Sequence, residues 1–64
     1  MAELHVRLVL DYFQAKSIRE RTEATLLGIV QHLADTYVLP REDRPRVYAT
    51  ALACARRRGW LQGD

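Results

Sequence analysis

Two prolines, Pro40 and Pro45, constrain the fold of this chain more than any other residues. Proline fixes its own φ angle, lacks a backbone donor and pushes the preceding residue out of helical conformation. A helix that approaches Pro40 must therefore end by Leu39. Pro45 stands in the first turn of a new helical pattern, where its missing N–H costs little, and Asp43 is placed to cap that turn. The stretch VLPREDRPR thus predicts a break followed by a helix over residues 44–58.

This third helix is expected to end in three consecutive arginines, residues 56–58, followed by Gly59. Cations are favourable in the last turn of a helix, and glycine supplies the left-handed residue that commonly follows it. The apolar tail over residues 59–62 then turns back, and we expect Trp60 to be largely buried against the first helix. Within the third helix, the stripe that faces the core is Val47, Ala51, Leu52 and Ala55.

Apolar residues also recur at helical spacing in two earlier segments. The first helix is expected over residues 3–16, although alternating apolar residues there also fit a strand. The second helix ends near residue 36. It begins near residue 18 if Ser17 and Glu20 form a capping box, or near residue 22 if Thr22 is the cap. The stripes are Val6, Val9, Leu10 and Phe13 in the first helix and Leu26, Ile29, Val30, Leu33 and Tyr37 in the second.

The length of the chain limits it to one small domain. A chain of 64 residues buries only about 60% of the surface that it exposes when unfolded, so its core is thin. A hydrophobic content of 48% is nevertheless that of a globular protein. The sequence therefore predicts a single all-α domain over residues 1–64, a small three-helix bundle with a net stability of roughly 3–5 kcal/mol.

The sequence lacks the residue clusters that catalysis or metal binding needs. Cys54 is the only cysteine, which precludes an internal disulfide and suits a reducing cytoplasm. One cysteine and two separated histidines, His5 and His32, do not make a zinc site. No carboxylate pair, activated nucleophile or glycine-rich phosphate loop is present, and no apolar run approaches the ~20 residues of a membrane span. We therefore expect a cytoplasmic protein with no catalytic residues, metal, cofactor or membrane partner.

Charge is distributed unevenly along the chain. Residues 1–40 carry four basic and five acidic side chains, a net charge of −1, whereas residues 41–64 carry six basic and three acidic ones, a net charge of +3. All six basic residues in the second segment are arginines. Arginine suits bidentate contact with phosphate, carboxylate or guanine better than lysine does. The residues that bracket the third helix are therefore the candidate binding residues.

The segment ARRRGWLQ, residues 55–62, resembles the end of the recognition helix and the first wing strand of winged-helix domains. The order of elements before it is similar to that of the linker-histone globular domain, within the wider helix-turn-helix superfamily. This resemblance implies a short strand over residues 17–21, between the first two helices. Only one strand fits after residue 58, so a winged-helix-like bundle with a truncated or absent wing is expected.

The resemblance and the arginines together predict double-stranded DNA as the partner. In a helix-turn-helix arrangement the start of the third helix faces the major groove, where arginine can donate two hydrogen bonds to guanine. Arginines at the far end would contact the phosphate backbone. The expected interface comprises Arg41, Arg44, Arg46, Ala49, Thr50, Ala53, Arg56 and Arg57.

The same residues support a second hypothesis, a small regulator or inhibitor that docks on a larger protein. The third helix is rich in alanine, and only one row of alanines is needed in the core. The other row can face a partner or a second copy of this chain, while the arginines meet an acidic protein surface. A steep salt dependence would indicate nucleic acid, and an apolar interface would indicate protein.

Overall fold

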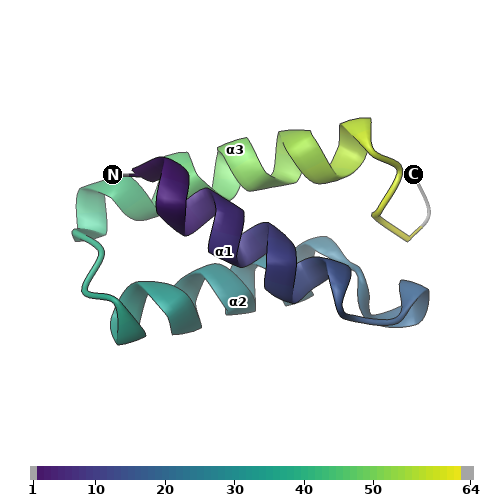
Figure 1. The fold of residues 1–64 in the computed structure, drawn as a ribbon, viewed down its shortest axis with the longest axis horizontal. Coiled ribbons are helices and arrows are strands. Elements are labelled where there is room, and N and C mark those ends of the chain that lie inside the picture. The colour runs from purple at the N-terminus through teal and green to yellow at the C-terminus, as the bar shows by residue number, and fades with distance from the viewer. Residues whose placement is uncertain (1, 63–64) are drawn as a thin grey trace.

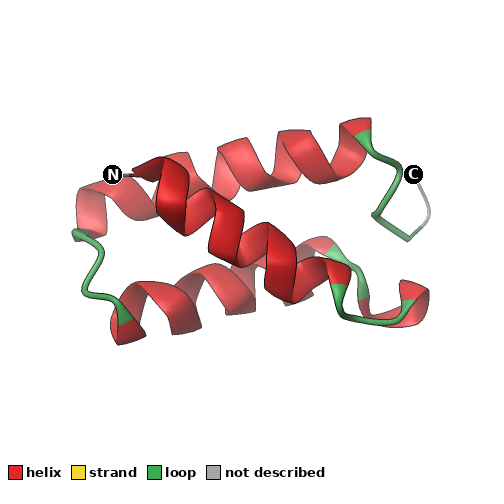
Figure 2. Cartoon of the chain, in the orientation of Figure 1, coloured by secondary structure: helices red, strands yellow, loops and turns green. Residues whose placement is uncertain are grey.

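The computed structural model describes residues 2–62 and consists of three α-helices. They are α1 (Ala2–Gln14), α2 (Glu23–Thr36) and α3 (Arg44–Arg57), and each packs against the other two (Figure 1). Two 3-10 helices, η1 (Ile18–Glu20) and η2 (Arg41–Asp43), lead into α2 and α3. Residues 2–62 contain no strand (Figure 2). The expectation of a small all-α three-helix bundle is therefore confirmed.

The first segment is a helix and not a strand. Val9 and Phe13, four positions apart, are 1% and 0% exposed, whereas Tyr12 is 49% exposed. This spacing of buried residues is that of an α-helix. The helix ends at Gln14, two residues before the expected end, because the Lys16 N–H already bonds to the Phe13 carbonyl in a tighter turn.

The connector between α1 and α2 is a 3-10 turn, so the strand expected over residues 17–21 is wrong. Glu20 Oε1 accepts from the Ser17 N–H at 3.4 Å and from the Ser17 hydroxyl at 3.1 Å. Thr22 Oγ1 then accepts from the Thr25 N–H at 3.2 Å and caps α2. Both alternative start signals are therefore used: Ser17 and Glu20 begin η1, and Thr22 begins α2. Polar side chains that bond to the nearby backbone favour such turns over strands.

Two ion pairs hold α2 and α3 antiparallel. Arg44 Nη2 lies 3.0 Å from Asp35 Oδ1 at one end of the pair, and Arg56 Nη2 lies 2.7 Å from Glu23 Oε2 at the other. The same number of positions separates the two acids on α2 as separates the two arginines on α3. The helices thus stay in register along their length. The molecule measures 30 × 18 × 16 Å, and both helices follow its longest axis (Figure 1).

The C-terminus of α3 ends as its sequence predicts. Gly59 has a φ of 69°, its N–H bonds to the Arg56 carbonyl, and the Trp60 N–H bonds to the Ala55 carbonyl at 2.9 Å. This pair of bonds satisfies carbonyls that the helix leaves unpaired. The tail then crosses to the α1–α2 connector, where the Gln62 N–H donates to the Arg21 carbonyl at 2.7 Å.

α2 ends with the same geometry but with a different residue type. The Leu39 N–H bonds to the Ala34 carbonyl at 2.9 Å, and the preceding residue, Val38, has a φ of 56°. Valine is β-branched and fits the left-handed region poorly. Its side chain is also 84% exposed, so burial of that side chain does little to offset the unfavourable backbone conformation.

All three helices, the α2–α3 connector and the C-terminal tail contribute to one core. Leu39 and Leu61, which follow the two helix ends, are 6% and 4% exposed and close the bundle at opposite ends. Trp60 is partly buried and packs against this core, as expected, although it is not among the fully buried residues. The buried residues are Val9, Phe13, Leu26, Val30, Leu33, Ala34, Leu39, Val47, Ala51, Ala55 and Leu61.

The start of α3 also differs in detail from the prediction. The Asp43 side chain makes no capping bond. η2 supplies a preceding turn instead, in which the Asp43 N–H donates to the Pro40 carbonyl at 3.0 Å. Pro45 lies in the first turn of α3, as expected.

Candidate binding surface on α3 and the α1–α3 groove

The outward side of α3 carries five of the eight residues that the sequence singled out. Each lies three or four positions from another member of the set, so they share one side of the helix, and all five are exposed. Two arginines lie at the ends of this side and three small residues lie between them. We call this set the basic face: Arg46, Ala49, Thr50, Ala53 and Arg57.

The other three predicted residues lie away from the centre of this face. Arg44 is half-buried and pairs with Asp35 on α2. Arg41 borders a hollow between α2 and α3 together with Arg44. Arg56 is exposed at the edge of the basic face but pairs with Glu23. The structure therefore does not join the eight residues into one site.

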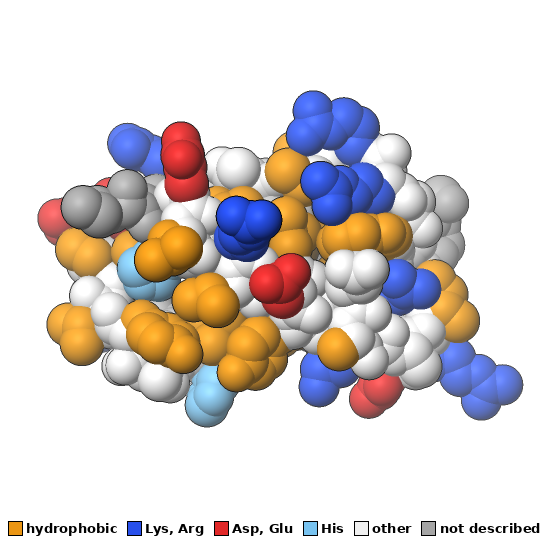
Figure 3. Space-filling model, viewed as in Figure 1, with side chains coloured by type: hydrophobic (Ala, Val, Ile, Leu, Met, Phe, Trp, Pro, Cys, Tyr) orange, Lys and Arg blue, Asp and Glu red, His pale blue; other side chains and the backbone are white. Residues whose placement is uncertain are grey.

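The end arginines of the basic face keep their charges available to solvent. Within residues 2–62, neither Arg46 nor Arg57 forms an ion pair. Arg57 Nη2 donates to Cys54 Sγ at 3.4 Å, and the guanidinium carbon of Arg58 lies 5.1 Å from the centre of the Trp60 ring. Figure 3 shows basic side chains, in blue, over the C-terminal end of α3.

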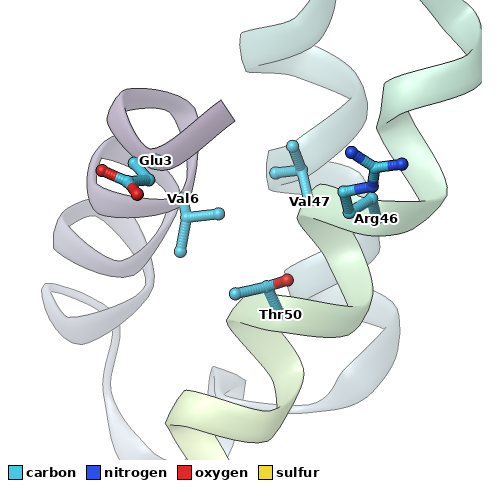
Figure 4. Close-up of a pocket in the computed structure, with 5 residues that line it drawn as sticks. All are labelled: Glu3, Val6, Arg46, Val47 and Thr50. Carbon is cyan, nitrogen blue, oxygen red and sulfur yellow. The ribbon is translucent and has the colours of Figure 1, made fainter. Parts of the chain in front are cut away.

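A groove runs beside the basic face, between α1 and α3. Val6 from α1 and Val47 from α3 point toward one another across it, and Thr50 lies at its mouth (Figure 4). Glu3 and Arg46 stand at its opposite edges. Toward the C-terminal end of α1 the groove continues along one further set of residues: Arg7, Leu10, Asp11, Gln14, Arg58 and Trp60.

The sequence reasoning missed this groove. Val6 and Leu10 were assigned to the core, yet both are only half-buried. One signal was present: Glu3, Arg7 and Asp11 recur every fourth position, which places three charges beside that apolar row on α1.

A separate apolar patch lies on the α1–α2 side of the bundle. Leu4, Tyr37 and Val38 are 65%, 51% and 84% exposed. The Tyr37 ring meets the His5 ring edge-on, with centroids 6.4 Å apart. Figure 3 shows hydrophobic side chains gathered over this part of α1 and α2, away from the arginines.

The side chains that could bind a metal ion are dispersed over the part of the chain that the structure describes. Within residues 2–62, no three His, Cys, Asp or Glu side chains are placed to hold a metal ion. Within the same residues, no helix is both long and apolar enough to cross a lipid bilayer.

No protein-family model, curated protein or solved structure matches this chain. The class that the fold defines is the small all-α three-helix bundle. Its candidate binding surfaces are the basic face and the adjoining groove.

Proposed function

We propose that this chain is a protein-binding module that docks on an acidic protein surface through the basic face of α3. One observation carries the proposal. Acids on α2 pair with Arg44 and Arg56, whereas Arg46 and Arg57 form no ion pair within residues 2–62 and lie exposed at the two ends of a strip of small side chains.

The residue types on this face suit a close protein contact. Ala49 and Ala53 have little side chain to order on binding and let a partner backbone approach α3 closely. The arginines at the ends would steer an acidic partner into place, because charged groups at the rim of an interface act mainly on the rate of association. A partner with carboxylates spaced to reach Arg46 and Arg57 fits this layout.

Two features favour a protein partner over duplex DNA. In a helix-turn-helix pair the two helices cross at about 90–120°, which lets the recognition helix project into the major groove. Here α2 and α3 run antiparallel and are paired at both ends, so α3 lies flush with its neighbours. Arg44, which the DNA hypothesis assigned to guanine, is also held by Asp35.

The test compares three fluorescent probes in binding titrations at two salt concentrations. One is a synthetic helix with glutamates on one side, the second is the same helix with lysines in their place, and the third is a random-sequence DNA duplex. Three variants accompany the wild type: Ala49→Arg, the double variant Arg46→Glu/Arg57→Glu, and Arg19→Glu. Arg19 is an exposed arginine on η1 and serves as the matched control.

The Ala49→Arg variant separates the two functions by the direction of its effect. It adds a positive charge and also blocks the centre of the basic face. We expect it to weaken binding of the acidic helix at least tenfold, while Arg19→Glu changes binding by less than about twofold. Stronger binding of DNA by Ala49→Arg, with a steep salt dependence and no affinity for the acidic helix, would instead assign nucleic-acid binding.

A further inference from the structure

The side chains that line the α1–α3 groove indicate what kind of partner would fit it. Its floor is apolar: Val47 is 1% exposed and Val6 and Leu10 are half-buried. Trp60, which is half-buried, lies at the far end. An apolar side chain inserted along this floor would remove more of Val6, Leu10 and Trp60 from water, which is favourable by about 25 cal/mol for each Å² buried.

The two edges of the groove differ in charge. Among the described residues that line the groove, the charged side chains on its α3 edge are Arg46 and Arg58, both positive. The α1 edge alternates in sign, because Glu3, Arg7 and Asp11 follow one another every fourth position. A ligand that fills the groove must be acidic on the α3 side and must alternate base, acid, base on the α1 side.

The dimensions of the groove suit a helix. Glu3 to Gln14 spans about 16 Å of α1 at 1.5 Å for each residue, close to three turns of a second helix laid beside it. Helices bind such grooves through apolar anchors spaced three or four positions apart. The alternating charges on α1 repeat every fourth position as well, so a helix can meet all of them in register.

We infer that the partner element is an amphipathic α-helix that lies in the α1–α3 groove. It inserts apolar side chains between Val6 and Val47, carries acidic side chains along its α3 edge, and carries a base opposite Asp11. This inference rests on the proposed function, because the groove adjoins the basic face through Arg46 and Thr50.

The charge at Asp11 distinguishes this inference from docking on the basic face alone. Asp11 is exposed and lies on α1, outside the basic face. If an acidic partner contacts α3 only, Asp11→Lys adds positive charge and binding is unchanged or tighter. If a helix fills the groove, the new lysine meets the partner's base and binding weakens.

The experiment uses two synthetic helices of identical composition and without tryptophan. The first carries the charges just described, and the second has the charges of its two edges exchanged. Trp60 is the only tryptophan of the chain, so its emission reports directly on the groove. Each helix is titrated into the wild type, Asp11→Lys and the matched control Glu42→Lys, which changes an exposed carboxylate on η2. Binding is also followed by a label on the helix.

We expect the first helix to bind the wild type more tightly than the second and to shift Trp60 emission to the blue. Asp11→Lys should weaken the first helix about three- to fivefold and should strengthen one that carries glutamate opposite residue 11. Binding that leaves Trp60 emission unchanged, or that Asp11→Lys tightens, would overturn the groove inference and leave docking on the basic face standing. Loss of all helix binding, with DNA bound instead, would overturn the proposed function itself.

Discussion

Arg56 donates from Nη2 to Glu23 Oε2 at 2.7 Å and so joins the last turn of α3 to the first turn of α2. Both side chains are about half-exposed, at 52% and 54%, so water screens the pair. Exposed ion pairs contribute about 0.2–1 kcal/mol. The pair therefore marks the register of the two helices but adds little to the stability of the fold.

We expect a double-mutant cycle of Glu23→Ala and Arg56→Ala to give a coupling free energy of about 0.5 kcal/mol, measured by urea unfolding. The coupling should fall further in high salt, because the charges are exposed. A coupling above 2 kcal/mol would show that the pair is shielded from water and that the register depends on it more strongly.

Val38 holds a left-handed conformation that costs a non-glycine residue roughly 1–2 kcal/mol. Val38→Gly should therefore stabilise the protein by about 0.5–1 kcal/mol, since the extra entropy of glycine in the unfolded chain offsets part of the gain. Thermal unfolding measures the change.

Gly59→Ala is the matched control for Val38→Gly. Gly59 occupies the same position at the end of α3, with a φ of 69°, and an added Cβ would meet no atom within 4 Å. The substitution should destabilise by about 1 kcal/mol through backbone conformation alone. If Val38→Gly also destabilised the protein, the strain assigned to Val38 would be wrong.

Leu61 should contribute more to stability than the larger Trp60. Leu61 is 4% exposed, whereas Trp60 is half-buried. We expect Leu61→Ala to cost about 2–4 kcal/mol and Trp60→Ala about 1–3 kcal/mol. Urea unfolding gives both values. A native protein in which acrylamide cannot quench Trp60 fluorescence would contradict this ranking.

Cys54 should be dispensable for binding. It is half-buried, and Arg57 donates to its sulfur at 3.4 Å, a contact that a serine hydroxyl can largely replace. Cys54→Ser should leave acidic-helix affinity within about twofold and cost less than about 1 kcal/mol of stability. A variant that folds normally yet loses binding would show that the thiol takes part in function.

The three helices were predictable because their signals are local. Spaced apolar residues, Thr22 as a cap, Pro40 as a stop and Gly59 as a left-handed residue each act within a few positions. The register of α2 and α3 was not predictable, since it depends on pairs such as Glu23 and Arg56 that are distant in sequence.

The basic face was predicted in part for the same reason. Helical spacing alone places Arg46, Thr50 and Arg57 on the outward side of α3. Arg44 was wrongly expected on the outward side. It lies three and seven positions before Val47 and Ala51, in the same row of the helix, and this row faces inward. The groove depends on how α1 packs beside α3, which no local pattern specifies.

The most direct test of the proposed docking face is amide chemical-shift mapping of the ¹⁵N-labelled protein with the acidic helix. The account predicts that shifts concentrate on Arg46, Ala49, Thr50, Ala53 and Arg57, and extend to the facing side of α1. Shifts confined to the apolar patch of Leu4, Tyr37 and Val38 would contradict it. So would a DNA duplex that moves the α3 amides while the acidic helix moves none.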